Sequence, residues 1–484
     1  MLLSTLIPHD EVAEVPSGAF SVAVTGLTAD SRRVTPGALF AALTGSKADG
    51  AAFIADAVEK GAVAILASET ADIPDELSIP VLRAREPRRA LAIIAARFYE
   101  RQPETIVAVT GTSGKTSVAE FTRQLFAAAG RRAASLGTIG VVKPDGAAYG
   151  SLTTPDPVTL HETLATLAGE GITHLAFEAS SHGLDQFRLD GVRVSAAAFT
   201  NLGRDHLDYH PTTGAYLAAK LRLFEELLPV GAPAIVNVDA PGAETVLQAA
   251  RLRGHRIVSV GSAGETLRLA ALDRDGFAQR MTLVYDGRTY EARLPLIGTY
   301  QVANALVALG LVLATGEDPA AVIPALAGLK GVRGRLDIVG EKNGALAVVD
   351  YAHKPEALEA ALAGLRPFAT GRLICVFGCG GDRDRGKRPI MGGIATSNAD
   401  IVIVTDDNPR TEDPAAIRAE ILAAAPGARE IGDRAEAIRA GVALLQPGDV
   451  IVVAGKGHET GQIVGQTVIP FSDHDCLAQA LQAS

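Results

Sequence analysis

Short apolar runs alternate with longer stretches of helical periodicity along most of this chain. In the first part of the sequence the runs are ALFAAL (38–43) and AVAILA (62–67), and a helical pattern follows within residues 85–105. Apolar runs of this length between turn-forming residues predict strands, and strands that alternate with helices predict parallel sheets. This segment is therefore expected to form a small α/β unit.

The same alternation continues toward the C-terminus. Further strand-like runs occur at 105–110, 174–179, 195–202, 233–239, 345–351, 372–378, 400–406 and 449–455. Helical patterns such as PEALEAALAGL (355–365) and PAAIRAEILAAA (414–425) separate the later runs. The pattern predicts an α/β protein with mostly parallel sheets, whose ligands bind at the C-terminal ends of the strands.

Two positions divide the chain. At 484 residues the sequence is too long for one hydrophobic core. The first border is placed near Arg88, within the helix that leads to the run at 105–110, and the second near the regularly spaced Gly328, Gly331 and Gly334. We predict three α/β domains, at residues 1–88, 89–332 and 333–484, of which the last is Rossmann-like.

Composition narrows the class of protein. Lys and Arg number 45 against 55 Asp and Glu, a net charge of −10, which disfavours a nucleic-acid binder that relies on overall positive charge. The chain has no run of about 18 apolar residues, and its start lacks a basic region followed by an apolar core. We expect a monomeric cytoplasmic enzyme without a signal peptide or membrane insertion. Cys375, Cys379 and Cys476 lack metal-finger spacing and are expected to be buried or idle thiols.

A glycine turn between a strand pattern and a helical pattern is the strongest chemical signal. TIVAVT (105–110) leads into TGTSGKTS (110–117). Backbone amides in such a turn bind phosphate oxygens, the lysine reaches the β- and γ-phosphates, and the next hydroxyl ligates Mg²⁺. The usual P-loop has a glycine where Val109 stands, so GKT is either accidental or part of a shorter P-loop. We predict an ATP site made by Gly111, Thr112, Ser113, Gly114, Lys115, Thr116 and Ser117.

Carboxylates and histidines follow at the next strand ends. Glu178 ends HLAFEA, and the segment FTNLGRDHLDYH (199–210) carries His206 and His210. Their i,i+4 spacing would suit zinc on a helix, but the segment follows a strand and precedes Pro211. A divalent-cation site beside a nucleotide is therefore favoured, and an exposed loop glutamate is the alternative for Glu178.

The segment AYLAAKLRLFEELL (215–228) predicts one amphipathic helix with Leu217, Leu221, Phe224 and Leu228 on a single stripe. Lys220 lies beside that stripe. From the residues alone we expect it to extend its ammonium group to water.

Three loops in the last third gather arginines and carboxylates. GCGGDRDRGKRP (378–389) superficially resembles a dinucleotide fingerprint, but Arg383 stands where the third glycine belongs, so that interpretation fails. TDDNPRTEDP (405–414) and AGKGHET (454–460) follow the next strands. Guanidinium and carboxylate groups at neighbouring strand ends predict a pocket for a ligand with carboxylates and an amine. Solvated loop charges are the alternative.

Together these segments resemble the Mur ligases, the ATP-dependent amide-forming enzymes of peptidoglycan assembly. TGTSGKTS is similar to the short P-loop of that family, which accounts for Val109. The resemblance covers essentially the whole chain, from DSRRVTPGALFAALTGSKADG (30–50) to AGKGHET. Folylpolyglutamate synthetases share the P-loop and central domain, but the DSR and DNPR segments favour the Mur ligases. A nucleotide-regulated binding protein or ATPase without ligase chemistry is the alternative from another class.

The resemblance implies roles for residues at matching positions. Lys220 matches a lysine that the family carries as a carbamate, which would turn a cation into a Mg²⁺ ligand. Two departures are Asp337, where the family commonly has glutamate, and Leu152, where some relatives carry a polar residue. The implied Mg²⁺ ligands are Thr116, Glu178, His206 and carbamylated Lys220, and the implied further ATP contacts are Asn304, Arg335 and Asp350. The implied contacts of the uridine nucleotide and muramoyl dipeptide are Ser31, Ser46, Lys47, Ala48, Thr153, Thr154, Ser180, Gln186 and Arg188, with the uridine nucleotide in the domain of residues 1–88.

DNPR (407–410) resembles the signature of family members that add meso-diaminopimelate, and lysine-adding members differ at the arginine. Diaminopimelate has a distal carboxylate that lysine lacks, and a guanidinium binds a carboxylate in bidentate fashion. Lysine would leave Arg410 buried without its anion, which is costly. The implied amino-acid contacts are Arg383, Asp407, Asn408, Pro409, Arg410, Gly455 and Glu459, with Glu459 facing an ammonium group.

The implied reaction joins these sites. The γ-phosphate of ATP passes to the D-glutamyl carboxylate of UDP-N-acetylmuramoyl-L-Ala-D-Glu, and the amine of diaminopimelate then displaces phosphate. ATP is a substrate, Mg²⁺ is the cofactor, and all substrates are small molecules. The implied catalytic residues are Lys115, Lys220, His206 and Glu178. A lysine-adding ligase of the same family is the nearest alternative, and Arg410 argues against it.

Overall fold

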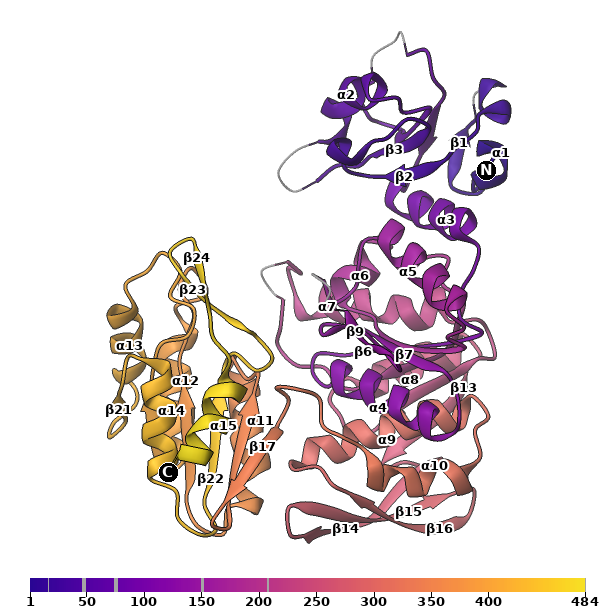
Figure 1. Cartoon of the computed structure of the whole chain (residues 1–484). Helices are drawn as coiled ribbons and strands as arrows, with labels where there is room; N and C mark the ends of the chain where they lie inside the picture. The colour runs from indigo at the N-terminus through magenta and orange to yellow at the C-terminus, as the bar shows by residue number, and fades with distance from the viewer. Residues whose placement is uncertain (16, 46–48, 74–76, 149–151, 207–208, 484) are drawn as a thin grey trace. The chain divides into compact units, whose positions relative to one another are not determined.

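The computed structural model describes residues 1–483 except 16, 46–48, 74–76, 149–151 and 207–208. The chain divides into two compact units, one of residues 1–268 with 306–322 and the other of residues 269–305 with 323–484. Figure 1 labels the helices and strands of each. No helix within the described residues is long and apolar enough to cross a membrane.

The first unit begins with a five-stranded sheet and three helices: β1 (Val12–Glu14), β2 (Gly26–Thr28), β3 (Ala38–Ala42), β4 (Ala64–Ser68), β5 (Val81–Ala84), α1 (Leu3–Leu6), α2 (Ile54–Glu59) and α3 (Pro87–Tyr99). The strand order is β1-β5-β4-β3-β2, and all pairs are parallel except β1 with β5. Successive side chains of β3 point to opposite faces, so Leu39 shares a core with α3 and Phe40 shares one with α2. The sheet is therefore covered on both faces, as the alternating pattern predicts.

A larger sheet follows in the same unit. Its elements are β6 (Thr105–Thr110), β7 (Ala133–Gly137), β8 (Gly140–Lys143), β9 (Gly146–Ala148), β10 (His174–Glu178), β11 (Val194–Phe199), β12 (Pro233–Asn237), β13 (Arg256–Gly261), α4 (Lys115–Ala128), α5 (Pro157–Gly169), α6 (Ser181–Asp185), α7 (Thr213–Arg222) and α8 (Ala243–Leu252). The run β13-β12-β11-β6-β10-β7 is parallel, and β8 and β9 extend it antiparallel. Since parallel strands end at one edge, the P-loop after β6 and Glu178 at the end of β10 become neighbours.

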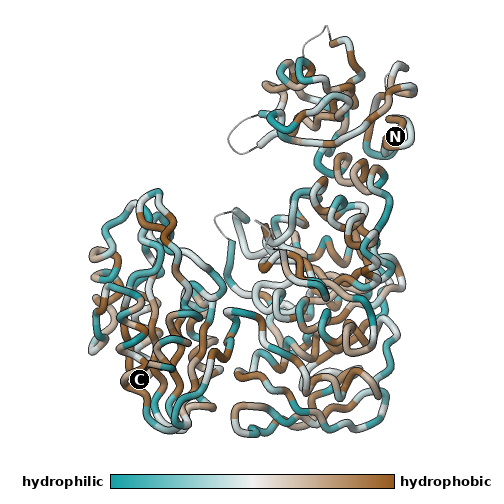
Figure 2. Tube along the Cα trace, viewed as in Figure 1, coloured by the Kyte–Doolittle hydropathy of each residue, from teal (hydrophilic) through white to brown (hydrophobic). Residues whose placement is uncertain are grey.

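The second unit contains a six-stranded sheet between helices. Its elements are β17 (Asp337–Lys342), β18 (Ala345–Asp350), β19 (Leu373–Phe377), β20 (Ile401–Val404), β21 (Arg429–Glu430), β22 (Val450–Ala454), α11 (Pro355–Leu365), α12 (Lys387–Asn398), α13 (Pro414–Leu422), α14 (Arg434–Ala443) and α15 (Asp473–Ala483). The order is β17-β18-β22-β19-β20-β21, and only β17 runs antiparallel to its neighbour. Phe377 packs with α11 and α12, whereas Val376 packs with α14. These apolar strands appear brown in Figure 2. A parallel sheet covered on both faces confirms the Rossmann-like prediction.

Smaller elements complete the chain. The borders between the units fall within β14 (Leu267–Asp275), α9 (Thr299–Ala314) and α10 (Pro319–Ala325). In the second unit β15 (Ala278–Tyr285) pairs antiparallel with β16 (Arg288–Leu294), and β23 (Gly461–Val464) pairs antiparallel with β24 (Thr467–Pro470). The second of these hairpins contacts the loop that carries DNPR.

The prediction of one regular helix over 215–228 is wrong in detail. Helix α7 ends at Arg222, and a π-helical turn, η4 (Leu223–Leu227), follows it. The Leu228 amide donates to the carbonyl of Leu223 at 2.9 Å, an i→i+5 bond. The wider turn lets Leu223 enter the core together with Phe224 and Leu228, although the predicted stripe contained only the last two of these residues.

Candidate functional site

The P-loop is held in place by the segment that follows β11. The amide of Thr112 donates to the carbonyl of Asn201 at 2.9 Å, and the amide of Ser113 donates to Asn201 Oδ1 at 3.0 Å. Thr200 Oγ1 donates to the carbonyl of Ser113 at 2.7 Å. Gly111 has φ 142°, and a Cβ there would lie 1.9 Å from Thr200 Oγ1. Only glycine therefore permits this close approach.

The predicted P-loop residues adopt the strand–turn–helix arrangement that phosphate binding requires. Gly114 has φ 87° and immediately precedes α4, so Lys115, Thr116 and Ser117 form the first turn of the helix. The N-terminal amides and dipole of a helix favour an anion at this position. The local structure supports a phosphate cradle, although the contacts of individual residues with ATP remain predictions.

Two lysine side chains converge on the carbonyl oxygen of Gly111. Lys115 Nζ and Lys220 Nζ each donate to it at 2.9 Å. Lys220 is 1% exposed, and its Nζ also lies 4.1 Å from the ring centroid of Tyr216. The expectation that Lys220 extends to water is therefore wrong, because α7 presents this side chain to the P-loop.

Burial and the charge of Lys115 lower the pKa of Lys220 to about 6. A neutral amine at pH 7 is the nucleophilic form that combines with carbon dioxide. The environment of Lys220 is thus chemically compatible with a carbamate, although the modification itself remains a prediction.

Glu178 is a buried carboxylate rather than an exposed loop residue, with 2% exposure. Its Oε1 accepts from the amide of Thr138 at 2.7 Å, and its Oε2 accepts from Thr138 Oγ1 at 3.2 Å. A Cβ at Gly137 would lie 2.1 Å from Oε1, so the carboxylate rests against backbone. The side chain is fixed at the C-terminal end of β10, directly opposite Val109.

His206 belongs to a cluster of aromatic rings. Its ring lies 4.7 Å from that of His182 and 6.2 Å from that of Tyr216, centroid to centroid. His206 has φ 53°, its amide donates to Asp205 Oδ1 at 2.8 Å, and its Nε2 lies 3.5 Å from Asp205 Oδ2. The Tyr216 ring therefore lies near both His206 and Lys220, and its hydroxyl bonds Thr112 Oγ1 of the P-loop at 3.3 Å.

The described residues contain no group of three His, Cys, Asp or Glu side chains that could hold a metal ion. A zinc site based on His206 and His210 therefore gains no support. The predicted Mg²⁺ ligands include the Thr116 hydroxyl and a modified Lys220, and a group made only of His, Cys, Asp and Glu would contain neither. Buried Glu178, Thr116 and a carbamate on Lys220 would supply the oxygen donors that Mg²⁺ prefers, so these residues fit the ion chemically.

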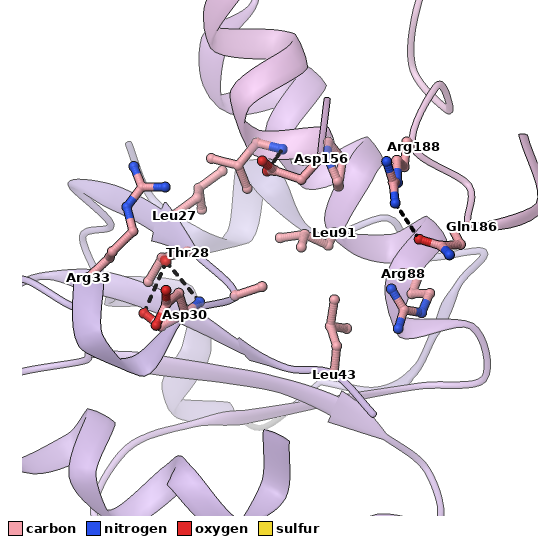
Figure 3. Close-up of a pocket in the computed structure, with 13 residues that line it drawn as sticks. Leu27, Thr28, Asp30, Arg33, Leu43, Arg88, Leu91, Asp156, Gln186 and Arg188 are labelled. Carbon is pink, nitrogen blue, oxygen red and sulfur yellow. Dashed lines mark hydrogen bonds between the residues drawn. The ribbon is translucent and has the colours of Figure 1, made fainter. Parts of the chain in front are cut away.

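A cavity of about 330 Å³ lies between the five-stranded sheet and α5. Figure 3 shows Asp30 and Arg33 on one side, with Arg88, Gln186 and Arg188 on the other. Leu27, Leu43 and Leu91 line the space between them. Three guanidinium groups against two carboxylates, the second being Asp156, give an excess of positive charge suited to an anionic ligand.

The polar residues of this cavity are positioned by local hydrogen bonds. Arg188 donates to the carbonyl of Thr154 at 2.7 Å and to Gln186 Oε1 at 2.7 Å. Burial lowers the pKa of Arg188 from its ordinary value. The Arg32 side chain and amide bind Asp30 and lower the pKa of Asp30 to about 2. The Asp30 carboxylate is therefore charged at neutral pH.

The cavity contains only part of the predicted muramoyl set. Gln186 and Arg188 line it, while Ser31 begins the adjacent short helix η2 (Ser31–Arg33) and is buried. Thr154 and Ser180 bond each other at 2.9 Å beside Glu178, and Thr153 bonds Thr138 at 3.1 Å. The predicted contacts Ser46, Lys47 and Ala48 lie outside the described residues. Leu152, which departs from some relatives, is 49% exposed.

Sequence reasoning missed four charged residues of the cavity, which are Asp30, Arg33, Arg88 and Asp156. Arg33 and Arg88 occur in the basic segments DSRR (30–33) and EPRR (86–89), and neither arginine was predicted to bind a ligand. Asp156 caps α5 by accepting from the amides of Val158 and Thr159. The basic clusters were a usable signal, but nothing in the linear pattern brings Arg33, Arg88 and Arg188 to one place.

The predicted nucleotide residues of the second unit form their own network. Asn304 Nδ2 donates to Gln301 Oε1 at 3.0 Å, and Gln301 donates to the carbonyl of Arg335 at 3.1 Å. The Arg335 guanidinium lies 4.6 Å from the centroid of the Tyr351 ring. Asp350 accepts from the amides of Leu336 and Ala352 at 2.7 and 2.8 Å.

Asp350 and Asp337 differ in their surroundings. Burial raises the pKa of Asp350, and the charge of Arg335 acts in the opposite direction. Asp337 Oδ2 accepts from His474 Nε2 at 2.6 Å and from the amide of Gly334 at 3.3 Å. The shorter aspartate thus has structural partners at the position where the family commonly carries glutamate.

Arg410 is clamped by two neighbouring backbone segments. Its amide donates to the carbonyl of Ile463 at 3.0 Å, and its Nη1 donates to the carbonyl of Gly381 at 2.8 Å. A Cβ at Gly380 would lie 2.8 Å from Nη1, and one at Gly381 would lie 2.0 Å from the carbonyl of Pro409. The glycines of GCGG therefore make room for DNPR, a role that the failed dinucleotide interpretation did not suggest.

The remaining predicted amino-acid contacts differ in exposure. Asp407 and Asn408 are buried, and a Cβ at Gly455 would lie 2.7 Å from Asp407 Oδ2. Arg383 is exposed and donates to the carbonyl of its neighbour Asp382 at 2.9 Å. Glu459 Oε2 accepts from Asn408 Nδ2 at 3.0 Å. The segments that follow β20 and β22 thus bring Asn408 and Glu459 together, although β19 lies between these strands. Their contact with an amino acid stays a prediction.

The cysteines take no part in these networks. Cys375 and Cys379 are buried, and burial raises the pKa of each to about 12. Cys476 is partly exposed. The prediction of buried or idle thiols is consistent with these positions.

Family models match three parts of the chain. The Mur ligase family, catalytic domain, matches residues 23–99, the Mur ligase middle domain matches 109–312, and the Mur ligase, glutamate ligase domain, matches 334–457. These matches include the P-loop, the cavity and most of the amino-acid pocket.

Relatives extend the similarity over the whole length. A Bradyrhizobium diazoefficiens protein named UDP-N-acetylmuramoyl-L-alanyl-D-glutamate--2,6-diaminopimelate ligase is 58% identical over 485 residues, which cover 99% of both chains. A Brucella melitensis protein of that name is 59% identical over 484 residues, which cover 100% of this chain and 99% of the relative. A solved structure of a protein of that name is 34% identical with a TM-score of 0.71, and 95% of each chain is covered.

The pinned glycine turn, the parallel sheets and the Rossmann-like second unit define an α/β protein with a P-loop. The whole-length similarity makes the assignment specific: the chain belongs to the Mur ligase family. It is therefore a ligase.

Proposed function

We propose that this chain is the ATP-dependent ligase that adds meso-diaminopimelate to the D-glutamyl carboxylate of UDP-N-acetylmuramoyl-L-Ala-D-Glu. The reaction would belong to peptidoglycan precursor synthesis in the cytoplasm. Whole-length identity above half to two relatives named for this substrate pair supports the proposal. The prediction of three domains at residues 1–88, 89–332 and 333–484 is retained as part of it.

The observation that carries the proposal is the clamped guanidinium of Arg410. Its backbone is bonded to Ile463 and its Nη1 to Gly381, while Glu459, which follows β22, is held by Asn408. A fixed guanidinium and a fixed carboxylate suit an amino acid that has a second carboxylate and a second ammonium group. L-Lysine would leave Arg410 without an anion, and this loss favours diaminopimelate as the substrate.

ATP is the proposed phosphoryl donor. The P-loop amides and the ammonium of Lys115 would hold the β- and γ-phosphates, and Asn304, Arg335 and Asp350 would contact the remainder of the nucleotide. The D-glutamyl carboxylate attacks the γ-phosphorus, the bond to the bridging oxygen breaks, and ADP leaves. Because two anions meet in this step, the ammonium group of Lys115 beside the Gly111 carbonyl reduces their repulsion.

Mg²⁺ is the proposed cofactor. Thr116 and Glu178 would hold one ion, and His206 with carbamylated Lys220 would hold a second. When bound, the two ions would neutralise charge on the phosphate oxygens. The burial of Glu178 and Lys220 supports this assignment, because a buried carboxylate and a buried carbamate both need a compensating cation.

The second step forms the amide. The neutral amine of diaminopimelate attacks the acyl carbon, phosphate departs with the carbon–oxygen electron pair, and the amine loses a proton. Arg410 and Glu459 would hold the distal end of the amino acid so that the reacting amine stays near the acyl phosphate. Arg383, Asp407, Asn408, Pro409 and Gly455 are proposed to complete this pocket.

The anionic uridine nucleotide substrate is proposed to bind in the first unit. The arginine-lined cavity would bind part of it through Arg33, Arg88 and Arg188, in addition to the predicted contacts. Thr153, Thr154 and Ser180, which lie beside Glu178, would orient the dipeptide toward the P-loop. Ser31 and residues 46–48 remain predicted contacts of the uridine part.

The proposal is tested by product analysis. The purified chain is mixed with ATP, Mg²⁺ and UDP-N-acetylmuramoyl-L-Ala-D-Glu, together with either meso-diaminopimelate or L-lysine, and the products are identified by mass. The proposal expects the tripeptide only with diaminopimelate. A product only with lysine would support a ligase but contradict the proposed role of Arg410 in substrate selection. ATP hydrolysis without either organic substrate would favour an ATPase.

A further inference from the structure

Lys456 is an unassigned buried cation beside the predicted amino-acid pocket. It follows β22 between Gly455 and Gly457, which have φ 118° and 53°. Its side chain turns inward and is completely buried. A lysine is rarely buried without specific partners, so its contacts indicate why it is there.

The ammonium group of Lys456 binds two of the predicted amino-acid contacts at once. Nζ donates to Asn408 Oδ1 at 2.9 Å and to Glu459 Oε2 at 3.0 Å. Asn408 Nδ2 also donates to Glu459 Oε2 at 3.0 Å. The three side chains therefore close a ring of hydrogen bonds.

The donor-only chemistry of lysine fixes the orientation of Asn408. Because an ammonium group has no acceptor, Asn408 must turn its carbonyl oxygen toward Lys456 and its NH₂ group toward Glu459. The amide of Ile463 donates to the same Asn408 oxygen at 3.0 Å. Without Lys456, a rotated amide would aim its oxygen at the Glu459 carboxylate.

The ring also connects the two ends of the pocket. The carbonyl of Ile463 accepts from the Arg410 amide at 3.0 Å, so Ile463 joins Asn408 to the backbone of Arg410. Among the described contacts, both bonds to the Glu459 carboxylate use Oε2. Neither of these bonds uses Oε1, so Glu459 can offer Oε1 to a ligand.

We propose that Lys456 is a positioning residue for the amino-acid substrate: it locks the Asn408 amide and directs the Glu459 carboxylate toward an ammonium group of diaminopimelate. The inference rests on the proposed function. Lys456 acts through Asn408 and Glu459, so its loss affects the amino acid and spares ATP.

The test is Lys456→Met, which keeps the length of the side chain and removes its charge and donors. We expect KM for diaminopimelate to rise about tenfold or more, the size expected for losing hydrogen bonds to a charged group, with KM for ATP within about twofold of wild type. Thr460→Ala is the matched control, because it changes an exposed residue of the same loop. Its KM values should equal those of wild type.

The outcomes separate this inference from the proposed function. An unchanged KM for diaminopimelate in folded Lys456→Met, or equal rises in KM for all substrates with a lower melting temperature, would overturn the positioning role. If Lys456→Met does not fold, the charge-neutral pair Lys456→Met with Glu459→Gln is compared with Glu459→Gln alone. Equal KM values for diaminopimelate in these two support coupling through Glu459, and a further additive rise overturns it. Wild type that makes no tripeptide would instead refute the proposed function.

Discussion

At the residue scale, Lys220 has the strongest conflict between its chemistry and its surroundings. It is 1% exposed, shares the carbonyl of Gly111 with Lys115, and has a pKa lowered to about 6 by burial and by that neighbouring charge. Two ammonium groups beside one phosphate cradle would repel each other. Conversion of Lys220 into a carbamate removes this repulsion and creates an anion that a cation can bind.

Lys220→Met is expected to reduce kcat about a hundredfold or more, because the carbamate oxygens are lost while the P-loop remains. The rate is followed by tripeptide formation, and ATP binding is followed by a thermal shift with the nucleotide. Lys143→Met, which removes a partly exposed ion pair with Glu170, is the control and should retain activity. A wild-type rate in Lys220→Met would remove the carbamate from the account.

Arg410 is the residue on which substrate choice depends. Arg410→Met is expected to lower kcat/KM for diaminopimelate by two to three orders of magnitude, about 3–4 kcal/mol, because a desolvated carboxylate loses its guanidinium. Initial rates at low diaminopimelate concentration measure this ratio. The control is Arg385→Met, which removes an exposed arginine that pairs with Glu420. Its kcat/KM for diaminopimelate should stay near that of wild type. Similar losses in both variants would assign Arg410 a general rather than specific role.

At the element scale, the turn between β6 and α4 depends on the absence of a side chain at Gly111. Gly111→Ala would place a Cβ 1.9 Å from Thr200 Oγ1 at φ 142°. We expect ATP affinity to fall at least about tenfold, because the turn must move away from Thr200. Titration calorimetry with a non-hydrolysable ATP analogue measures the affinity.

Gly130→Ala separates this steric effect from backbone strain alone. Gly130 also has positive φ, 81°, but a Cβ there would meet no atom within 4 Å. It should lower stability by about 1 kcal/mol and leave ATP affinity unchanged. Equal ATP affinities for the two variants would show that the P-loop does not need the close approach of Thr200.

The helices α14 and α15 are joined by a buried ion pair. Arg434 and Asp473 are both 0% exposed in their side chains, and Arg434 also donates to the carbonyl of Ala454 at the end of β22. Asp473→Asn should destabilise the second unit by about 3–5 kcal/mol, because it leaves a buried guanidinium without its anion. Urea denaturation measures the loss.

Asp275→Asn is the control for that experiment, since it alters an exposed pair with Arg293 and should cost less than about 1 kcal/mol. The combination of Arg434→Met with Asp473→Leu should be less harmful than Asp473→Asn, since no charge remains buried. A denaturation midpoint for Asp473→Asn equal to that of Asp275→Asn would contradict the structural role of the pair.

The sequence predicts elements well where one periodicity governs them. The run TIVAVT and the helix PEALEAALAGL match β6 and α11 residue for residue, because strand and helix patterns there are uninterrupted. The π-helical turn after Arg222 was not predictable, since it arises from tertiary packing of Leu223, Phe224 and Leu228. The burial of Lys220 against the P-loop was likewise not predicted, because it depends on the tertiary contact of its ammonium group with the Gly111 carbonyl.

At the scale of the whole molecule, the sequence predicts which chemistry is present more readily than which residues meet. The glycine turn and the DNPR loop were recognisable because each follows a strand and is contiguous in sequence. The cavity lined by Arg33, Arg88 and Arg188 was not predictable, because it joins segments that lie 55 to 155 positions apart in the sequence. The ring of Lys456, Asn408 and Glu459 likewise needs three strands in register, because β19 lies between β20 and β22.

The central claim is that these sites catalyse one reaction through an acyl phosphate. The most direct measurement uses UDP-N-acetylmuramoyl-L-Ala-D-Glu with both oxygens of the D-glutamyl γ-carboxylate replaced by a heavy isotope, together with ATP, Mg²⁺ and meso-diaminopimelate. The account predicts that one heavy oxygen appears in inorganic phosphate, that the other remains in the amide of the tripeptide, and that ADP forms in equal amount. Heavy oxygen in AMP, or phosphate without heavy oxygen, would contradict it.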